Sequence, residues 1–298
     1  SAHESTEEMT DKPEESAVTL GVVAICYNEE EDLPRFIEHL MPWVDEIILI
    51  DDGSTDSTGE IAVAHPEKVS FITSSRGEGE YFSHQRNKGI QASNSQWLLH
   101  MDVDERVPPE MAEEVLRLIR NGVKDAYRFS RRNHFLHRHM RGGGWQDWNH
   151  VHLARREVLQ FAGMFHEDCV LSVPEQRVGQ LHSSIYHLNE DSFAKRLSKS
   201  DRYLEELVSA LRKRGEKPGW VSLLIRPGME FVKKYFYKGG FRDGVPGFIF
   251  ALHAATALFR AHALLWDEQN RIPRAALEDR LRAEWDGVEI SSMQERHD

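Results

Sequence analysis

Four short apolar runs alternate with amphipathic segments between residues 18 and 102, and this order constrains the fold most. The segments 30–41, 54–65 and 83–93 have helical spacing, capping candidates or helix-forming residues. The alternation predicts a parallel sheet covered by helices on both faces. Ligands of such sheets bind beyond the carboxyl ends of the strands, so polar residues at those ends are candidate site residues. The expected strands read VTLGVVAICY, VDEIILID, VSFITS and QWLLHMD.

The pattern changes after residue 124. Residues 125–137, 149–157 and 177–187 predict β segments interleaved with loops, and the chain after Asn189 predicts helix, with Gly215 as a stop. We therefore expect an α/β domain over 19–188, divided into halves 19–110 and 111–188, and a helical region over 189–298. Residues 1–18 are acidic and almost without apolar side chains, which predicts a disordered tail. The expected helical face contains Phe193, Leu197, Leu204, Leu207, Val208 and Leu211.

Composition excludes several classes of protein. A net charge of −12 argues against general nucleic-acid binding. Cys26 and Cys169 lie far apart, which disfavours a disulfide framework and favours a reducing compartment. The N-terminal residues lack the pattern of a signal peptide, and no window reaches about 18 uninterrupted apolar residues, so no transmembrane helix is expected. Against this acidic background, residues 195–242 contain thirteen Lys or Arg and only five Asp or Glu.

Three carboxylates follow the last expected strand of the first half, in WLLHMDVDERV (97–107). If the chain stays extended to residue 104, Asp102 and Asp104 point the same way, because strand side chains alternate. Two converging carboxylates suit Mg²⁺ or Mn²⁺. Glu105 would point the other way and is expected to be structural. The alternative is a solvated acidic turn that stops the strand before Pro108.

Polar clusters also follow the other expected strands. In IDDGSTDST, Asp52 can accept hydrogen bonds from a ribose or a base, although an Asp-Gly turn before a capped helix explains the motif equally well. In CYNEEED, Asn28 and Glu29 could hold a ribose or base. In SSRGEGEYFSHQRNKG, Arg86 and Lys88 are cationic candidates for phosphate. Neither a G-x-G-x-x-G after the first strand nor a P-loop motif is present.

Together, VVAICYNEEEDL, EIILIDDGSTDST, QRNKGIQAS and WLLHMDVDE resemble the family 2 glycosyltransferases with the GT-A fold. The resemblance implies inverting transfer of a sugar from a nucleotide-diphospho-sugar, usually with a divalent metal. It makes 19–110 the nucleotide-sugar half and 111–188 the acceptor half. It implies metal binding by Asp102 and Asp104 as a D-x-D motif, completed by a late histidine, His187. The expected donor-binding residues are Tyr27, Asn28, Glu29, Asp52, Arg76, Arg86, Asn87 and Asp102.

The later motifs GMFHEDCVL, LHSSIYHLN and RPGMEFVKKYFYKGGFRDGVPGFIFAL resemble the WaaE-like branch, lipopolysaccharide inner-core β-glucosyltransferases acting at the cytoplasmic membrane face. This implies glucose as the sugar, UDP as its carrier and a lipopolysaccharide-core or other glycan acceptor. The base that takes the acceptor proton is expected at Glu167, with Asp168 next. Alternatively, Glu167 anchors a loop by pairing with Arg155 or Arg156.

Two features leave partners and competing functions open. The basic, aromatic stretch 220–242 suits contact with an anionic membrane, although a helical pair packed on the catalytic domain or on a second subunit would look the same. The expected location is cytoplasmic, peripheral on the inner membrane.

Eight of sixteen histidines lie within 134–187, without cysteine partners at zinc-finger spacing, and most are expected to face the cleft or solvent. Competing functions are a sugar nucleotidyltransferase, disfavoured by CYNEEED after the first strand, and an inactive nucleotide-binding scaffold.

Overall fold

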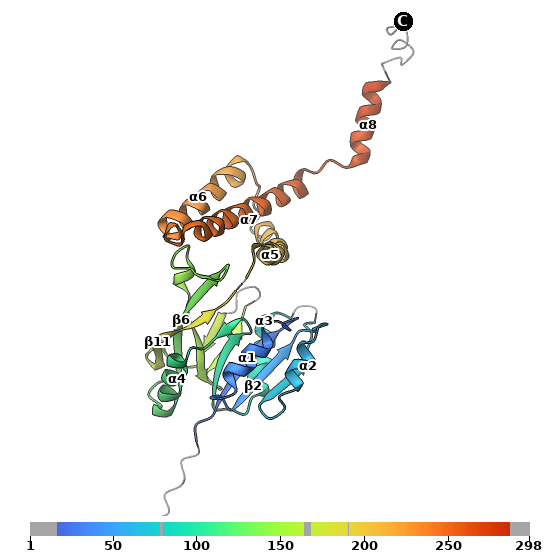
Figure 1. Cartoon of the computed structure of the whole chain (residues 1–298). Helices are drawn as coiled ribbons and strands as arrows, with labels where there is room; N and C mark the ends of the chain where they lie inside the picture. The colour runs from blue at the N-terminus through green and yellow to red at the C-terminus, as the bar shows by residue number, and fades with distance from the viewer. Residues whose placement is uncertain (1–16, 78–79, 164–167, 190, 287–298) are drawn as a thin grey trace, which may run out of the picture. The chain divides into compact units, whose positions relative to one another are not determined.

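The computed structural model describes residues 17–77, 80–163, 168–189 and 191–286 (Figure 1). The chain divides into two compact units, Ser1–Asp191 and Ser192–Asp298. The expected disordered tail lies almost entirely outside the described residues.

Among the described residues of unit 1, nine strands form one mixed sheet in the order β3-β2-β1-β4-β8-β6-β11-β5, with β7 paired to β6. The strands β1 to β4 run parallel, as the strand–helix alternation predicts, and β6 runs parallel to β11. Antiparallel β8 joins the two groups. The bounds are β1 (Leu20–Cys26), β2 (Glu46–Asp51), β3 (Val69–Thr73), β4 (Trp97–Asp102), β5 (Glu105–Arg106), β6 (Ala126–Phe135), β7 (Arg138–His139), β8 (Asn149–Arg155) and β11 (Val178–His187).

Helices cover both faces of the parallel part of the sheet, because successive strand residues point to opposite faces. On β1, Val22 and Ala24 pack with buried residues of α1 (Leu33–Leu40), α2 (Thr58–Val63) and α4 (Pro109–Asn121). Val23 faces the opposite side, where α3 (Phe82–Ala92) lies (Figure 1). A Cβ on Gly89 of α3 would lie 2.3 Å from Val23 Cγ1, so glycine lets this helix approach the sheet.

Most expected elements of unit 1 are confirmed within a few residues. The helix expected over 30–41 begins at Leu33, because residues 29–32 form a turn in which Leu33 N donates to Glu29 O. Helix α4 has no counterpart among the predictions. It starts with Pro109 in its first turn, buries Met111 and ends at Gly122, whose φ of 63° is the left-handed helix cap that glycine favours. A separate two-stranded sheet, also unpredicted, pairs β9 (Leu159–Ala162) with β10 (Asp168–Leu171).

Unit 2 is helical in its described residues, as expected. A buried cluster formed by Val208, Leu211, Ala261 and Leu265 joins α5 (Phe193–Lys213) to α7 (Gly244–Asn270). Of the expected α5 face, Phe193 and Leu197 are instead exposed. A continuous helical run contains α6 (Arg226–Val232) between two π-helical turns, Val221–Ile225 and Lys233–Tyr237. The last helix, α8 (Arg274–Trp285), has no buried residue.

Candidate functional site at the carboxyl ends of the strands

The acidic motif follows the end of β4 and leads into β5, which pairs with the end of β11. After Asp102 the chain turns at residues 103 and 104 and enters β5, which runs antiparallel to β11 and pairs Glu105 with His187. The expectation that extended backbone continues to residue 104 is therefore wrong. The turn is held by two hydrogen bonds: Asp102 N donates to Glu105 Oε2 (2.9 Å), and Leu188 N donates to Asp104 O (2.9 Å).

The turn nevertheless brings the expected metal ligands together. One ligand atom from each of Asp102, Asp104 and His187 lies within 4.8 Å of the others. Glu105 is buried and takes no part in this group, because its carboxylate accepts the Asp102 amide hydrogen bond and pairs with Arg131. These contacts are consistent with the structural role expected for Glu105.

Two guanidinium groups, one buried (Arg86) and one partly buried (Arg131), hold the Asp102 carboxylate. Arg86 Nη2 lies 2.7 Å from Oδ1, and Arg131 Nη2 lies 3.3 Å from Oδ2. Burial would raise the pKa of Asp102, but the charges of Arg86 and Arg131 outweigh it and hold this pKa well below its ordinary range. Asp102 therefore stays ionised at neutral pH. Arg131 also stacks over the Trp148 ring at 4.0 Å from its centroid.

His187 connects Asp104 to a third strand. Its Nε2 lies 3.2 Å from Asp104 Oδ2, and its Nδ1 lies 2.8 Å from Asn133 Oδ1 on β6. Burial lowers the pKa of His187, but the hydrogen bond with Asp104 and the negative charge of that carboxylate together outweigh burial, so the pKa is raised above its ordinary value. An Asn133 acceptor at Nδ1 fixes the proton there and leaves Nε2 as the atom that points at the carboxylates.

The donor set decides which cation fits. Carboxylate oxygens alone suit Mg²⁺, whereas a mixed set of carboxylate oxygens and one imidazole nitrogen suits a transition ion such as Mn²⁺ better. Asp104 and His187 are the residues best placed to ligate, since both Asp102 oxygens already contact arginines. The side chains at this position thus fit a divalent cation.

Beside this group, hydrogen bonds tie the loops after β1 and β2 to each other. The Asn28 side chain accepts from Thr55 N (2.8 Å), and Asn28 N donates to Ser54 Oγ (2.9 Å). Asn28 has a φ of 54°, a conformation that Asn tolerates better than most residues. Glu29 N donates to Thr58 Oγ1 (2.8 Å), and Tyr27 is about half exposed at the end of β1. The two loops therefore form one polar rim at the sheet edge.

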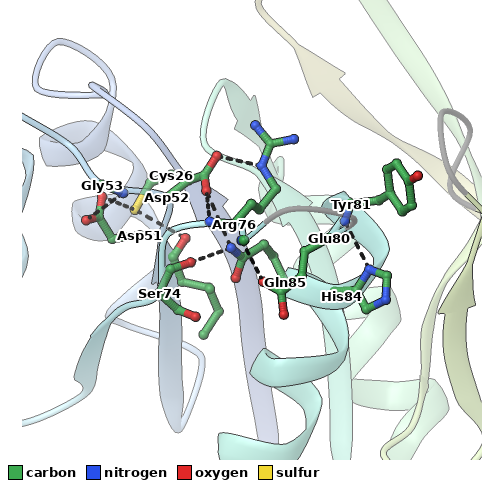
Figure 2. Close-up of polar contacts among 12 residues, drawn as sticks. Cys26, Asp51, Asp52, Gly53, Ser74, Arg76, Glu80, Tyr81, His84 and Gln85 are labelled. Carbon is green, nitrogen blue, oxygen red and sulfur yellow. Dashed lines mark hydrogen bonds and ion pairs between the residues drawn. The ribbon is translucent and has the colours of Figure 1, made fainter.

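Asp52, which directly follows β2, is also part of this rim and forms an ion pair with Arg76. Its carboxylate accepts from Arg76 Nε (2.8 Å) and Arg76 N (2.9 Å), as Figure 2 shows, and Gln85 Nε2 lies 3.4 Å away. Asp51, by contrast, caps the turn by accepting from Gly53 N and Ser54. The Asp-Gly motif therefore has two parts: the first aspartate builds the turn, and Asp52 lies beside a cation at the rim.

A sequence model of Glycosyl transferase family 2 matches residues 21–172, just over half of the chain. The chain belongs to glycosyltransferase family 2. Its mixed sheet with flanking helices and C-terminal helices has the GT-A-like arrangement expected from the sequence.

Several known proteins are similar to this glycosyltransferase. The lipopolysaccharide core biosynthesis glycosyltransferase LpsC of Rhizobium meliloti is 24% identical over 266 residues, covering 88% of this chain and 97% of LpsC. An undecaprenyl-phosphate 4-deoxy-4-formamido-L-arabinose transferase of Pectobacterium carotovorum is 35% identical over 112 residues, 34% of this chain and 32% of that protein. Among solved structures, S. aureus TarS 1-349 with UDP-GlcNAc has a TM-score of 0.43 at 14% identity, covering 83% and 84% of the two chains.

Helix α3 of the glycosyltransferase carries three of the polar residues singled out in the sequence. Arg86 contacts Asp102, as described above. Asn87 instead pairs with the backbone of Phe161, donating from Nδ2 to O (2.8 Å) and accepting from N (2.9 Å), so its amide fastens β9 to the helix. Lys88 lies 3.0 Å from both Ser74 Oγ and Glu80 Oε2. Donor binding by Asn87 stays a prediction.

The expected base is not part of the described site. Glu167 lies outside the described residues, and Asp168 begins β10 with only its backbone described. Their assignment as base stays a prediction. Arg155 and Arg156, the alternative partners of Glu167, contact other groups: Arg155 Nε donates to Asp125 (3.1 Å) and Arg156 Nη1 donates to Ser93 O (2.5 Å).

Three site residues have no counterpart among the sequence predictions: Arg131, Asn133 and Trp148. The first two lie at alternate positions near the end of β6, so they share one face of the sheet. Polar residues at alternate positions of a partly buried strand, in YRFSRRN, were a usable signal. No sequence pattern indicated Trp148, because its contact with Arg131 depends on the path of the loop before β8.

The dense histidines of the second half have mixed surroundings. His150 is exposed, but His152 is buried and contacts the rings of Trp148, Phe129 and Phe161. Four of the seven described histidines in this region are exposed, in line with the expectation for most of them, and His152 is an exception. Burial lowers its pKa to about 3, so it stays neutral and acts as part of the aromatic packing under the site.

Proposed function

We propose that this family 2 glycosyltransferase transfers a hexose, with glucose favoured, from a UDP-linked donor to a lipopolysaccharide-core or related glycan acceptor, with inversion at the anomeric carbon. One observation carries the metal-dependent part: Asp102, Asp104 and His187 come within 4.8 Å of one another at the carboxyl ends of β4 and β11. Ligands of open α/β sheets bind at that edge. Similarity to LpsC over most of both chains supports the acceptor class.

Asp104 and His187, with Asp102 beside them, would hold one divalent ion. When bound, such an ion supplies positive charge to the leaving nucleoside diphosphate. The chain's own residues prepare this position. Arg86 and Arg131 keep Asp102 ionised, and Asn133 orients His187.

Donor recognition would use the polar rim. Asp52 and Arg76 face each other across one ion pair, so a nucleobase or ribose entering there exchanges hydrogen bonds with a preformed pair. Tyr27 supplies a half-exposed aromatic surface at the end of β1. Asn28 and Glu29 fix the loop that carries it.

Inversion requires one displacement. The acceptor hydroxyl oxygen bonds to the anomeric carbon while the bond from that carbon to the diphosphate oxygen breaks on the opposite side. The hydroxyl proton passes to a carboxylate, for which we propose Glu167 and, next, Asp168. The diphosphate leaves with the bonding electron pair. We also propose that the reaction takes place at the cytoplasmic face of the inner membrane.

The reaction is tested by incubating the protein with UDP-, GDP- and dTDP-sugars, Mn²⁺ and a lipopolysaccharide-core oligosaccharide, and measuring the released nucleotide. We expect acceptor-dependent release of nucleoside diphosphate and an inverted linkage in the product by NMR. Pyrophosphate release would show nucleotidyl transfer instead. Nucleotide binding without release from any donor would favour a scaffold. Glu38→Ala on the exposed side of α1 serves as an acidic-residue control that should not alter release.

A further inference from the structure

Unit 2 exposes an apolar stripe where a water-facing helix normally carries polar residues. The helical run 220–237 presents eight exposed apolar side chains, with Trp220 and Tyr237 each more than 80% exposed. We call this set the α6 face. Its members are Trp220, Val221, Leu224, Ile225, Met229, Val232, Phe236 and Tyr237.

The opposite side of the same run is occupied by packing within unit 2. Phe231 stacks with Tyr235 at a centroid distance of 5.4 Å, and both rings contact Phe248 of α7. The run is therefore apolar on both sides, which a helix lying on a water-soluble surface is not. A continuous apolar face of this kind marks an interaction surface.

An open groove lies in the α6 face. It has a volume of about 500 Å³, and its lining is apolar apart from Lys233 and the hydroxyl of Tyr237. The exposed Val245 and Phe248 lie on the adjoining helix α7. The apolar lining of the groove suits a hydrocarbon chain rather than a polar ligand.

Charge identifies the partner. Residues 217–242 contain six Lys or Arg and one acidic residue, Glu230, in a chain with 37 basic and 49 acidic residues. Glu230 lies 3.5 Å from Lys234, and Arg226 pairs with Glu216 just before the segment (2.9 Å), so the segment keeps a net positive charge. A second copy docking through this face would bring two cationic segments together. The surface of an anionic lipid bilayer has apolar chains beneath negatively charged headgroups. It therefore complements both the apolar α6 face and the positive charge of the segment.

We propose that the α6 face docks this protein on the surface of an anionic phospholipid bilayer. Trp220 and Tyr237 enter the interface, and Lys233, Lys238 and Arg242 contact the headgroups. This inference gives the membrane location under the proposed function a defined surface and lipid class. Vesicle binding needs no sugar donor, so it can fail or succeed independently of the transferase reaction.

The docking is interfacial rather than transmembrane. The helix Gly240–Asn270 is long and apolar enough to cross a membrane by length and composition, and 39% of its most apolar window is buried. However, polar groups along it are used within unit 2: Arg260 donates to Asp201 (2.6 Å) and Ser200 (2.9 Å), and buried His253 contacts the Phe193 ring. If α7 left α5 and crossed the bilayer, Arg260 would lose its contact with Asp201 and its charge would be unpaired in lipid.

The test is co-sedimentation of the full chain with vesicles of phosphatidylglycerol and phosphatidylcholine, compared with phosphatidylcholine alone. We expect binding only to the anionic vesicles, weakened by 0.5 M salt because headgroup attraction is screened. Lys233→Gln with Lys238→Gln should weaken binding by about 10- to 30-fold, from roughly 1 kcal/mol per basic residue. Trp220→Ser with Tyr237→Ser should reduce it similarly.

Matched controls come from α8, which is also exposed. Trp285→Ser and Arg282→Gln should leave vesicle binding unchanged. Equal binding to neutral vesicles, or equal loss in the α8 controls, would overturn the proposal. So would protein that stays with the vesicles through both high salt and alkaline carbonate, which would indicate a span. A dimer abolished by Trp220→Ser with Tyr237→Ser, without vesicle binding by the wild type, would assign the face to a second copy.

Discussion

Replacing Arg131 by Met should destabilise unit 1 through the charge that it leaves behind. The Arg131 guanidinium lies 2.5 Å from Glu105 Oε1, and the Glu105 side chain is only 1% exposed. Asp102 keeps Arg86 as a partner when Arg131 is removed, but Glu105 loses its ion pair. Removing one partner of a buried ion pair costs about 3–5 kcal/mol at a pH at which the other group stays ionised, because its charge is then buried and unpaired.

The matched variant is Arg131→Met combined with Glu105→Gln. With both charges gone, the cost of the buried carboxylate disappears, and we expect the double variant to recover at least half of the lost unfolding free energy. Stability is measured by pulse hydrogen exchange of the β4 and β11 peptides at increasing urea, which reports unit 1 alone. A double variant no more stable than Arg131→Met would refute the reasoning.

The same pair predicts a pH dependence. Burial raises the pKa of Glu105, the ion pair with Arg131 opposes this, and the charge of Asp102 adds to it. A raised pKa gives stability that is complete below the unfolded value of ~4.3 and is lost as pH rises through the folded pKa. Without Arg131 that pKa rises further. The unfolding free energy of Arg131→Met should therefore fall more steeply than that of the wild type between pH 5 and pH 8.

Three further predictions follow from single contacts. Asn133→Ala should weaken Mn²⁺ binding about 10- to 100-fold by releasing His187, whereas Asn133→Asp keeps the acceptor and should retain binding; calorimetric titration distinguishes them. Glu114 accepts hydrogen bonds from two backbone N–H groups of β11, which hold its pKa below the ordinary value although burial opposes this. Glu114→Gln should therefore cost about 1.5–3 kcal/mol at pH 7, and progressively less as pH falls below the unfolded value of ~4.3 and through the lowered folded pKa; urea unfolding at neutral and at acidic pH measures this. Gly89→Ala should destabilise unit 1 by about 1–3 kcal/mol in the same assay, because its Cβ meets β1, whereas Gly59→Ala meets only ordinary contacts.

The parallel strands and most of their helices could be predicted from the sequence, because apolar spacing within each element determines which face is buried. Helix α4 was equally predictable: Met111, Val115 and Ile119 lie on one buried face, and Gly122 marks the end. The convergence of the acidic motif with His187 could be anticipated only from the family resemblance, since no local pattern relates positions that far apart.

The remaining site contacts depend on tertiary pairing. Asn133 reaches His187 across 54 residues of sequence through the parallel pairing of β6 with β11. Arg131 reaches Asp102 and Glu105 because β5 folds back on β11, and a two-residue strand of Glu105 and Arg106 has no recognisable periodicity. Sequence spacing therefore identified candidate ligands. It did not identify Asn133, which orients His187, or Arg131, which helps to keep Asp102 ionised.

The most direct test of the central claim is the affinity of UDP for the protein, measured calorimetrically with Mn²⁺ and after chelation. The metal site predicts that Mn²⁺ strengthens UDP binding to the wild type and to the Glu38→Ala control. It also predicts that Asp104→Ala abolishes this difference, because one of the two best-placed ligands is gone. An undiminished Mn²⁺ effect in Asp104→Ala would contradict the assignment of this site.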